Sequence, residues 1–277
     1  MSFETDGFFS SEVETFRRYV RENEPFKAWF DYALDLNRLG FGMLRGVETS
    51  RSDNRLIALN ALFVRVHHSF QSALILAERG LITDARAVLR SGVESAIAIN
   101  ALAKDASFVD QMIEAHHRSQ RTRARTGLYK FPDSFSTEDK VGMTEAIADA
   151  EAYQPANGKE LTDIKWEQVA DKHCPELYQL LYRDLSSDGA HATINVLQRF
   201  LVVDSSEQIT AFKVAPDIEG DTKELIEVLK TATLLFTWSA MPYADLNGLS
   251  DAMAAITERM QQFATLPSAF PREVAVA

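Results

Sequence analysis

Apolar residues recur at steps of three and four along most of the chain, which is the spacing of helices that bury one face. In residues 54–79 the pattern runs through Leu59, Leu62, Phe63, Val66, Phe70, Ala73, Leu74 and Ala77, and it stops at Gly80, a common helix end. The predicted helices are 26–46, 54–79, 82–104, 106–127, 136–152, 161–173, 175–187, 189–202, 221–246 and 249–264. Residues 207–214 (EQITAFKV) are β-branched and partly alternating, so they predict a short strand or one arm of a hairpin.

This pattern predicts an all-α protein, a multi-helix bundle with at most one short strand or hairpin near residues 207–214. The chain contains neither an internal repeat nor a linker that would divide it, so we expect a single helical domain over residues 1–277. Its core should span about residues 26–264. The ends, residues 1–20 and 265–277, are polar and are expected to be loose.

The helix predicted at residues 82–104 should lie at the centre of the bundle. Its stretch ARAVLRSGVESAIAINALA carries small or apolar residues on every side, which is typical of a buried helix. The charges within that stretch are Arg86, Arg90 and Glu94, and their spacing of four places them on one strip. Buried charges must be paired. Two interpretations stay open: a structural Arg–Glu clamp between helices, and a pocket wall with a positioned acid.

Composition narrows the class of protein. The chain has 277 residues, of which 46% are hydrophobic and 25% charged, as in soluble globular proteins. A net charge of −11 argues against general binding to nucleic acids or anionic membranes, but not against a local basic site. The single cysteine, Cys174, excludes an internal disulfide and a cysteine-based zinc site. The first residues lack the order of a signal peptide, and the longest apolar run, 231–244, is too short for a membrane span. We expect a cytoplasmic bacterial protein without a membrane partner.

One segment is strongly basic. Residues 116–130 contain four arginines, one lysine and no acid, so their charge is +5 and the remaining chain carries −16 (−11 minus +5). Arg118, Arg121 and Arg125 fall on one helical face, and His117 lies beside them. Such a run is either a solvated face or the seat of a phosphate group, and RNA or another polyanion is the partner that it would fit.

The stretch YRDLSSDGAHAT, residues 182–193, forms a polar corner between two predicted helices. Arg183 lies on the last turn of one helix and His191 on the first turn of the next, so the two should meet. A histidine there could deprotonate a 2′-hydroxyl while an arginine stabilises phosphate charge, which would cleave RNA without a metal ion. The alternative is a structural histidine. The candidate catalytic residues are His191, Arg183 and Ser186, with Glu94 and Arg90 from the central helix.

A metal site is a further alternative. The spacings Glu114-x-x-His117 and Asp188-x-x-His191 place a carboxylate and an imidazole on one helical face, as in di-metal carboxylate bundles. The additional carboxylates would have to come from Glu78, Glu94 or Glu227. The glutamate set is incomplete, so we expect neither a metal nor a cofactor.

Two blocks, LRSGVESAI at 89–97 and LYRDLSSDGAHAT at 181–193, resemble the signature blocks of a bacterial helical family known as domain of unknown function five-six-seven-seven. The matching residues are Arg90, Glu94, Tyr182, Leu185, Ser186 and His191. The likeness covers roughly residues 55–215 and implies a helical fold without implying an activity. More distantly, Arg183-Asp184 followed by His191 resembles the Arg-polar-x-His motif of HEPN ribonucleases, although seven residues separate Arg183 from His191 here.

The HEPN resemblance implies an RNA-cleaving toxin or phage-defence effector, in which a homodimer would form a composite site. The other hypothesis is a non-catalytic binding or scaffold module. The arrangement of side chains at the corner would distinguish the two hypotheses. A nuclease requires Arg183 and His191 to converge on an open cleft, with the basic segment on the same side.

Overall fold

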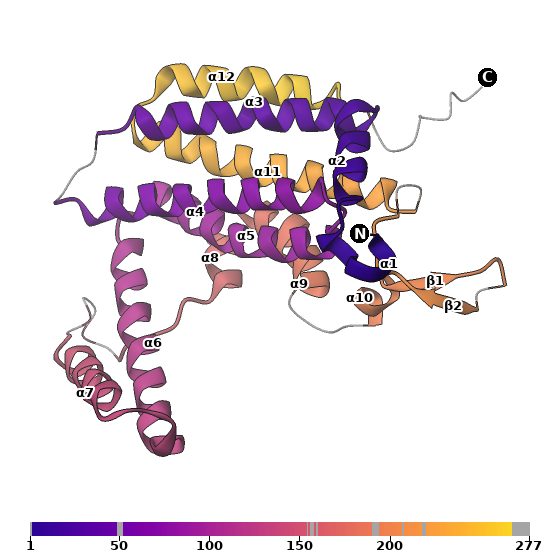
Figure 1. The fold of residues 1–277 in the computed structure, drawn as a ribbon. Coiled ribbons are helices and arrows are strands. Elements are labelled where there is room, and N and C mark those ends of the chain that lie inside the picture. The colour runs from indigo at the N-terminus through magenta and orange to yellow at the C-terminus, as the bar shows by residue number, and fades with distance from the viewer. Residues whose placement is uncertain are drawn as a thin grey trace.

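Stacked long helices form the body of the protein in the computed structural model (Figure 1), which describes residues 2–48, 52–153, 155, 158, 160–189, 194–206, 208–217 and 220–267. The main helices are α3 (Phe26–Arg45), α4 (Asn54–Ala77), α5 (Ile82–Lys104) and α11 (Thr222–Leu246). Helix α4 packs along α5, α11 packs on both, and α3 covers α11 together with α12 (Ser250–Phe263). The all-α prediction is confirmed.

Helix α5 is the central helix, as the sequence predicts. It contacts α4 and α11, and also α6 (Phe108–Lys130), α8 (Trp166–His173), η3 (Leu177–Tyr182) and α9 (Arg183–Gly189). A run from Ser95 to Ile99 is buried on every side. Gly92 allows three helices to approach closely, because a Cβ there would come within 2.8 Å of the Leu235 side chain and 3.1 Å of Ser69. The packed core therefore surrounds α5 and holds its polar residues in fixed positions.

Helix α11 continues through Pro242, and a side chain of α5 compensates for the proline. Proline has no backbone N–H, so the carbonyl of Trp238, four residues earlier, loses its helical donor. The Asn100 side-chain amide donates to this carbonyl at 3.2 Å. A polar residue in the buried helix thus satisfies a backbone group that the sequence of α11 leaves without a partner.

The N-terminal residues are packed, in contrast to the loose end expected for residues 1–20. They form α1 (Phe3–Asp6), η1 (Gly7–Phe9) and α2 (Val13–Glu22). The buried side chains of Phe16 and Val20 belong to the core. The polar composition of this segment led to the expectation of a loose end, although α2 is an amphipathic helix with one buried face. At the other end, residues 268–277 of the expected loose tail lie outside the described residues.

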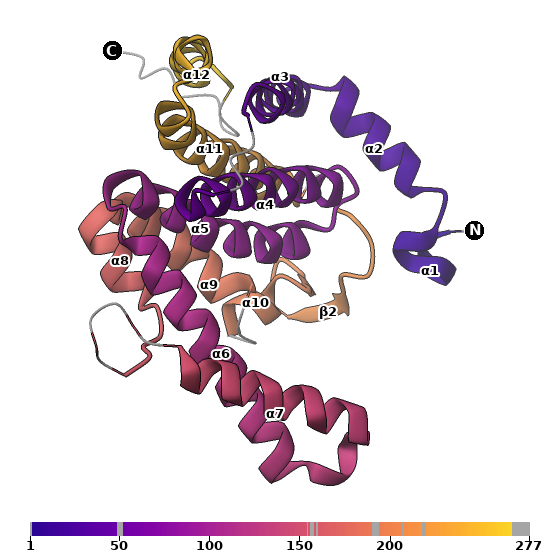
Figure 2. The same cartoon turned by 90° about the vertical axis from the view of Figure 1, so that its left-hand side faces the viewer.

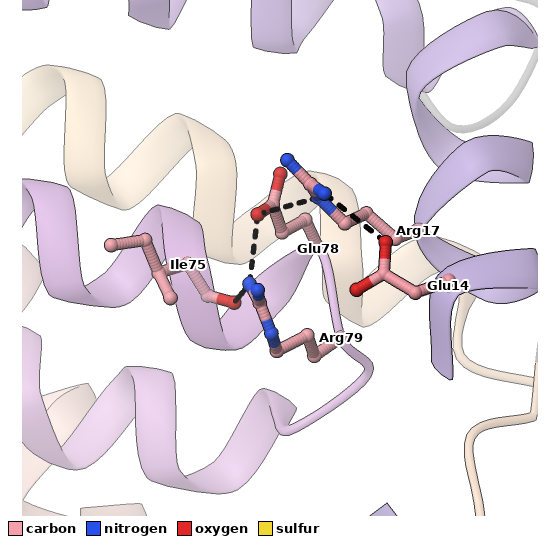
Figure 3. Close-up of polar contacts among 5 residues, drawn as sticks. All are labelled: Glu14, Arg17, Ile75, Glu78 and Arg79. Carbon is pink, nitrogen blue, oxygen red and sulfur yellow. Dashed lines mark hydrogen bonds and ion pairs between the residues drawn. The ribbon is translucent and has the colours of Figure 1, made fainter. Parts of the chain in front are cut away.

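A buried carboxylate attaches α2 to the end of α4 (Figure 3). Glu78 accepts hydrogen bonds from Arg17 Nε at 3.0 Å and from Arg79 Nη1 at 2.8 Å. Arg17 also bonds Glu14 at 3.1 Å, and Arg79 bonds the Ile75 carbonyl at 3.0 Å. Two guanidinium groups therefore compensate the burial of one carboxylate, whose side chain is only 11% exposed.

The middle of the chain forms an arm. Helices α6 (Phe108–Lys130) and α7 (Thr137–Ala152), joined through η2 (Pro132–Ser134), pack on each other and project away from the body (Figures 1 and 2). The chain then returns to α5 through α8 (Trp166–His173). The helix predicted at 161–173 therefore begins five residues later than expected.

The last part of the family-like segment is less helical than predicted. After η3 (Leu177–Tyr182), which is a π-helix, come α9 (Arg183–Gly189) and α10 (Ile194–Gln198). The prediction of a helix over 189–202 is therefore wrong for its last residues, because α10 ends at Gln198 and a strand begins at Leu201. Residues Leu201–Val203 form β1, which pairs antiparallel with β2 (Ile209–Phe212). This pairing confirms the hairpin predicted near residues 207–214 and supplies its second arm. Within the described part of the chain, no helix has the length and apolar character needed to cross a membrane.

Candidate functional site

Arg90 of the central helix anchors a polar cluster against η3 and α9. Its Nε donates to Ser186 Oγ at 3.0 Å and its Nη2 to the Tyr182 hydroxyl at 2.9 Å. Nη1 lies 3.6 Å from Glu94 Oε1, one helical turn along α5. The guanidinium carbon also lies over the Tyr182 ring, 4.9 Å from its centroid. Arg90 thus binds three side chains from two segments that are about ninety residues apart.

The tyrosine hydroxyl links the cation to the anion. It accepts from Arg90 and donates to Glu94 Oε1 at 3.2 Å. The Arg90 and Glu94 side chains are 26% and 25% exposed, so they are half-buried and paired rather than fully buried as expected. Burial raises the pKa of the Tyr182 hydroxyl, and the neighbouring Glu94 carboxylate raises it further. Tyr182 therefore stays protonated and keeps its hydrogen bond to the acid.

The π-helix η3 aligns these side chains with α5. Its terminal residue is Tyr182, and Tyr178 stacks on it with ring centroids 4.9 Å apart. Leu181 and Leu185 are buried beneath the polar residues and fix the segment on the core. Single π-helical turns inside α-helices occur frequently at functional sites. The local irregularity and the polar cluster coincide at one position.

The structure brings together three of the five predicted catalytic residues, Arg90, Glu94 and Ser186. Arg183 is exposed and donates from Nη1 to Gln179 Oε1 at 3.0 Å. His191 lies outside the described residues, so its approach to Arg183 stays a prediction. Sequence reasoning missed Tyr182 as a site residue. The available signals were its match to the family's signature blocks and its position one helical turn before Ser186.

The basic segment lies on the arm, and acids pair with two of its arginines. Arg118 forms an ion pair with Asp163, and Arg125 Nη2 bonds Glu151 Oε1 at 2.7 Å. The ring of His117 stacks on a tyrosine, Tyr153, rather than joining the arginines. Arg121 is half-buried on the same helix. Figures 1 and 2 show the arm projecting away from the bundle that carries the Arg90 cluster.

The predicted metal ligands are dispersed. Glu78 forms ion pairs with two arginines. Glu227 Oε2 lies 3.6 Å from Lys230 Nζ, and Glu114 is buried on the arm. Among the residues that the structure describes, no group of three or more histidine, cysteine, aspartate or glutamate side chains could hold a metal ion. Asp188 and His191, the second predicted pair, have side chains outside the described set.

Comparisons with known proteins identify one family. Residues 56–209 match the model of a protein family that is described as a Family of unknown function (DUF5677). The matched segment contains every residue of the Arg90 cluster. No curated protein and no solved structure matches the chain.

Proposed function

Because the chain belongs to the Family of unknown function (DUF5677), we propose its function from its own residues: metal-independent cleavage of RNA at the corner formed by residues 182–193. Cleavage of cellular RNA would make the protein a toxin-type effector, for example in phage defence. The residues proposed to carry the chemistry are Arg183 and His191.

The observation that supports this proposal is how the central helix holds the corner. Arg90 bonds the residues on both sides of Arg183, namely Tyr182 and, three positions on, Ser186. Glu94 completes the network through the tyrosine hydroxyl. These contacts fix the backbone of α9 while the Arg183 guanidinium stays exposed to a ligand. Arg183, the proposed charge-stabilising group, thus stands on a fixed element, which is the preorganisation that catalysis needs of such a group.

The reaction requires no co-reactant. His191 would take the proton from a ribose 2′-hydroxyl, whose oxygen then forms a bond to the adjacent phosphorus. The bond from phosphorus to the 5′-oxygen breaks, and this oxygen receives a proton from His191 or from water. The products are a 2′,3′-cyclic phosphate and a 5′-hydroxyl. Arg183 would stabilise the charge on the phosphate oxygens, and Arg90 and Glu94 act as positioning residues.

The basic segment has a secondary role in this proposal. Since Arg118 and Arg125 are already paired with acids, Arg121 is the member of the stripe left to contact an RNA phosphate at a distance from the corner. Replacing Arg121 with alanine should weaken RNA binding and lower its salt dependence, without changing the cleavage step itself.

A non-catalytic scaffold is the second candidate, and one observation favours it. The Nε, Nη1 and Nη2 atoms of Arg90 all face partners within the cluster, at 3.0, 3.6 and 2.9 Å. Such a closed network is also what a purely structural clamp would look like. In that case the corner is a polar break between helices, and its residues affect stability alone.

The test is RNA cleavage by the purified full chain in buffer that contains EDTA. His191→Ala and Arg183→Ala should each reduce cleavage by roughly 10²–10⁴-fold, the usual effect of removing a general base or a charge-stabilising group. Arg38→Ala, an exposed arginine on α3, is the matched control and should cleave as the wild type does. A 2′,3′-cyclic phosphate on the product would support the mechanism.

Expression in cells provides the second readout. Wild-type protein should slow growth and fragment RNA under an inducing condition, and the His191→Ala variant should do neither while keeping its melting temperature. If wild-type protein cuts no RNA in either assay and His191→Ala only lowers the melting temperature, the scaffold candidate replaces the nuclease.

A further inference from the structure

Large apolar side chains are exposed along residues 194–214, which contain α10 and the β1–β2 hairpin. Eight of the eighteen large hydrophobic residues that are exposed in the described part of the chain fall within this segment. They are Ile194, Leu197, Phe200, Val202, Val203, Ile209, Phe212 and Val214. Ile194 and Phe212 are each 70% exposed. Scattered apolar residues on a surface are normal, but a concentration of them within one short segment is typical of an interaction site.

The hairpin lacks the pattern of a sheet that faces water. Leu201 pairs with Phe212 on one face, and Val202 pairs with Ala211 on the other, so both faces are apolar. A solvated sheet would alternate apolar and polar positions. Among the described residues the sheet has only these two strands, so each has one edge that no further strand covers, and such edges favour pairing with another strand. A hairpin of two strands is marginal by itself in water. Figure 1 shows it projecting from the body.

Charge indicates which partner this surface fits. Residues 194–214 contain one arginine, one lysine, one aspartate and one glutamate, so their net charge is zero in a chain of −11. Arg199 pairs with Glu224, and Lys213 Nζ bonds Asp221 at 2.7 Å. Two copies of so acidic a chain repel each other over most of their surface. The neutral apolar hairpin is a place where they can meet without that repulsion.

We propose that the hairpin and α10 form a homodimer interface, in which this surface of one copy packs against the same surface of a second copy. A two-fold arrangement requires a self-complementary patch, and a neutral apolar surface with free strand edges satisfies that requirement. Helix α10 contacts α9 within each copy, so the proposed interface adjoins the helix that carries Arg183. The proposal does not depend on RNA cleavage, since it concerns association alone.

The first test is the mass of the full chain in solution, measured by light scattering after size-exclusion chromatography. Wild-type protein should elute as a dimer of the 31.0 kDa chain at micromolar concentration. Val203→Asp places a charge in the patch and should raise the dimer dissociation constant at least tenfold. The matched control is Val141→Asp on the arm, where the valine is 54% exposed against 56% for Val203. It should leave the mass unchanged.

The second test locates the interface. Cys174 is buried and burial raises its pKa to about 12, so an introduced cysteine would be the reactive thiol of the native chain. Ala211→Cys, on the exposed hairpin, should form disulfide-linked dimers under mild oxidation. Gly142→Cys, at an open position on α7, should not.

Two outcomes would overturn the proposal. A wild-type chain that is monomeric up to roughly 100 µM, well above typical dissociation constants of specific dimers, would assign the patch to a different partner. A dimer that Val203→Asp leaves intact, with no cross-link through Ala211→Cys, would place the interface elsewhere. Neither result changes the RNA assay, so failure of the dimer and failure of the nuclease are distinguishable.

Discussion

Removing the Tyr182 hydroxyl should weaken the connection between the central helix and the corner by a measurable amount. Tyr182→Phe keeps the ring over Arg90 but deletes a hydrogen bond of 2.9 Å from Arg90 and one of 3.2 Å to Glu94. Hydrogen bonds to charged groups contribute about 1.5–3 kcal/mol each. Since both charged side chains are a quarter exposed, water replaces part of what is lost. We therefore expect Tyr182→Phe to lower the free energy of unfolding by about 1–2 kcal/mol.

Arg90→Met removes more, because the arginine also donates to Ser186 at 3.0 Å. Its expected cost is about 2–3 kcal/mol, and a double variant with Tyr182→Phe should show a coupling energy of roughly 1 kcal/mol. Thermal or urea denaturation of the four proteins measures these values, and each kcal/mol should lower the melting temperature by about 2–4 °C. Tyr178→Phe, on the same π-helix, is the matched control and should change stability by less than about 0.5 kcal/mol.

Additivity of the two substitutions would refute this reasoning. If Arg90→Met and Tyr182→Phe add without coupling, the guanidinium and the hydroxyl do not act together in solution. If Arg90→Met lowers the free energy of unfolding by less than about 0.5 kcal/mol, the cluster does not stabilise the fold.

Three further predictions concern other parts of the molecule. Asn100→Ala should cost about 1–2 kcal/mol in the wild type but less in a Pro242→Ala background, because the restored N–H then satisfies the carbonyl that Asn100 serves; urea denaturation measures the difference. The Lys172 hydrogen bond lowers the pKa of Asp105 from 3.8 to about 2, so this carboxylate stabilises the folded state above pH 4 and loses that effect as the pH falls toward 2. The melting temperatures of wild type and Asp105→Asn should therefore converge between pH 5 and pH 2. Burial raises the pKa of Cys174 to about 12, so a thiol reagent at pH 8 should modify it only after urea is added.

The long helices could be predicted from the sequence because their signals are local. The periodicity over 54–79 and the stop at Gly80 gave α4 and the start of α5 within two residues of the observed bounds. The β1 strand could not be predicted in this way. Leu201-Val-Val is a short apolar run, and such a run fits the end of a helix as well as a strand. Its pairing with β2 decides the matter, and that pairing is a tertiary contact.

The candidate site was only partly predictable, for a geometric reason. Periodicity placed Arg90 and Glu94 on one strip of α5, and the structure confirms their pairing. It also placed Arg183 on the last turn of a predicted α-helix, at the polar corner. The π-helix that ends at Tyr182 changes which side chains face α5, so Tyr182 and Ser186 turn inward while Arg183 stays exposed. Hydrophobic spacing carries no signal for such a turn.

The position of α11 determines how far this protein can be truncated. The family match ends at residue 209, whereas α11 begins at Thr222 and packs against α3, α4 and α5. A fragment limited to residues 56–209 would expose the faces of α4 and α5 that α11 covers, and would be expected to aggregate or remain molten. The length of chain by which the family is recognised is thus shorter than the length that closes its hydrophobic core. A truncated protein that keeps the Arg90 cluster must therefore also include α11.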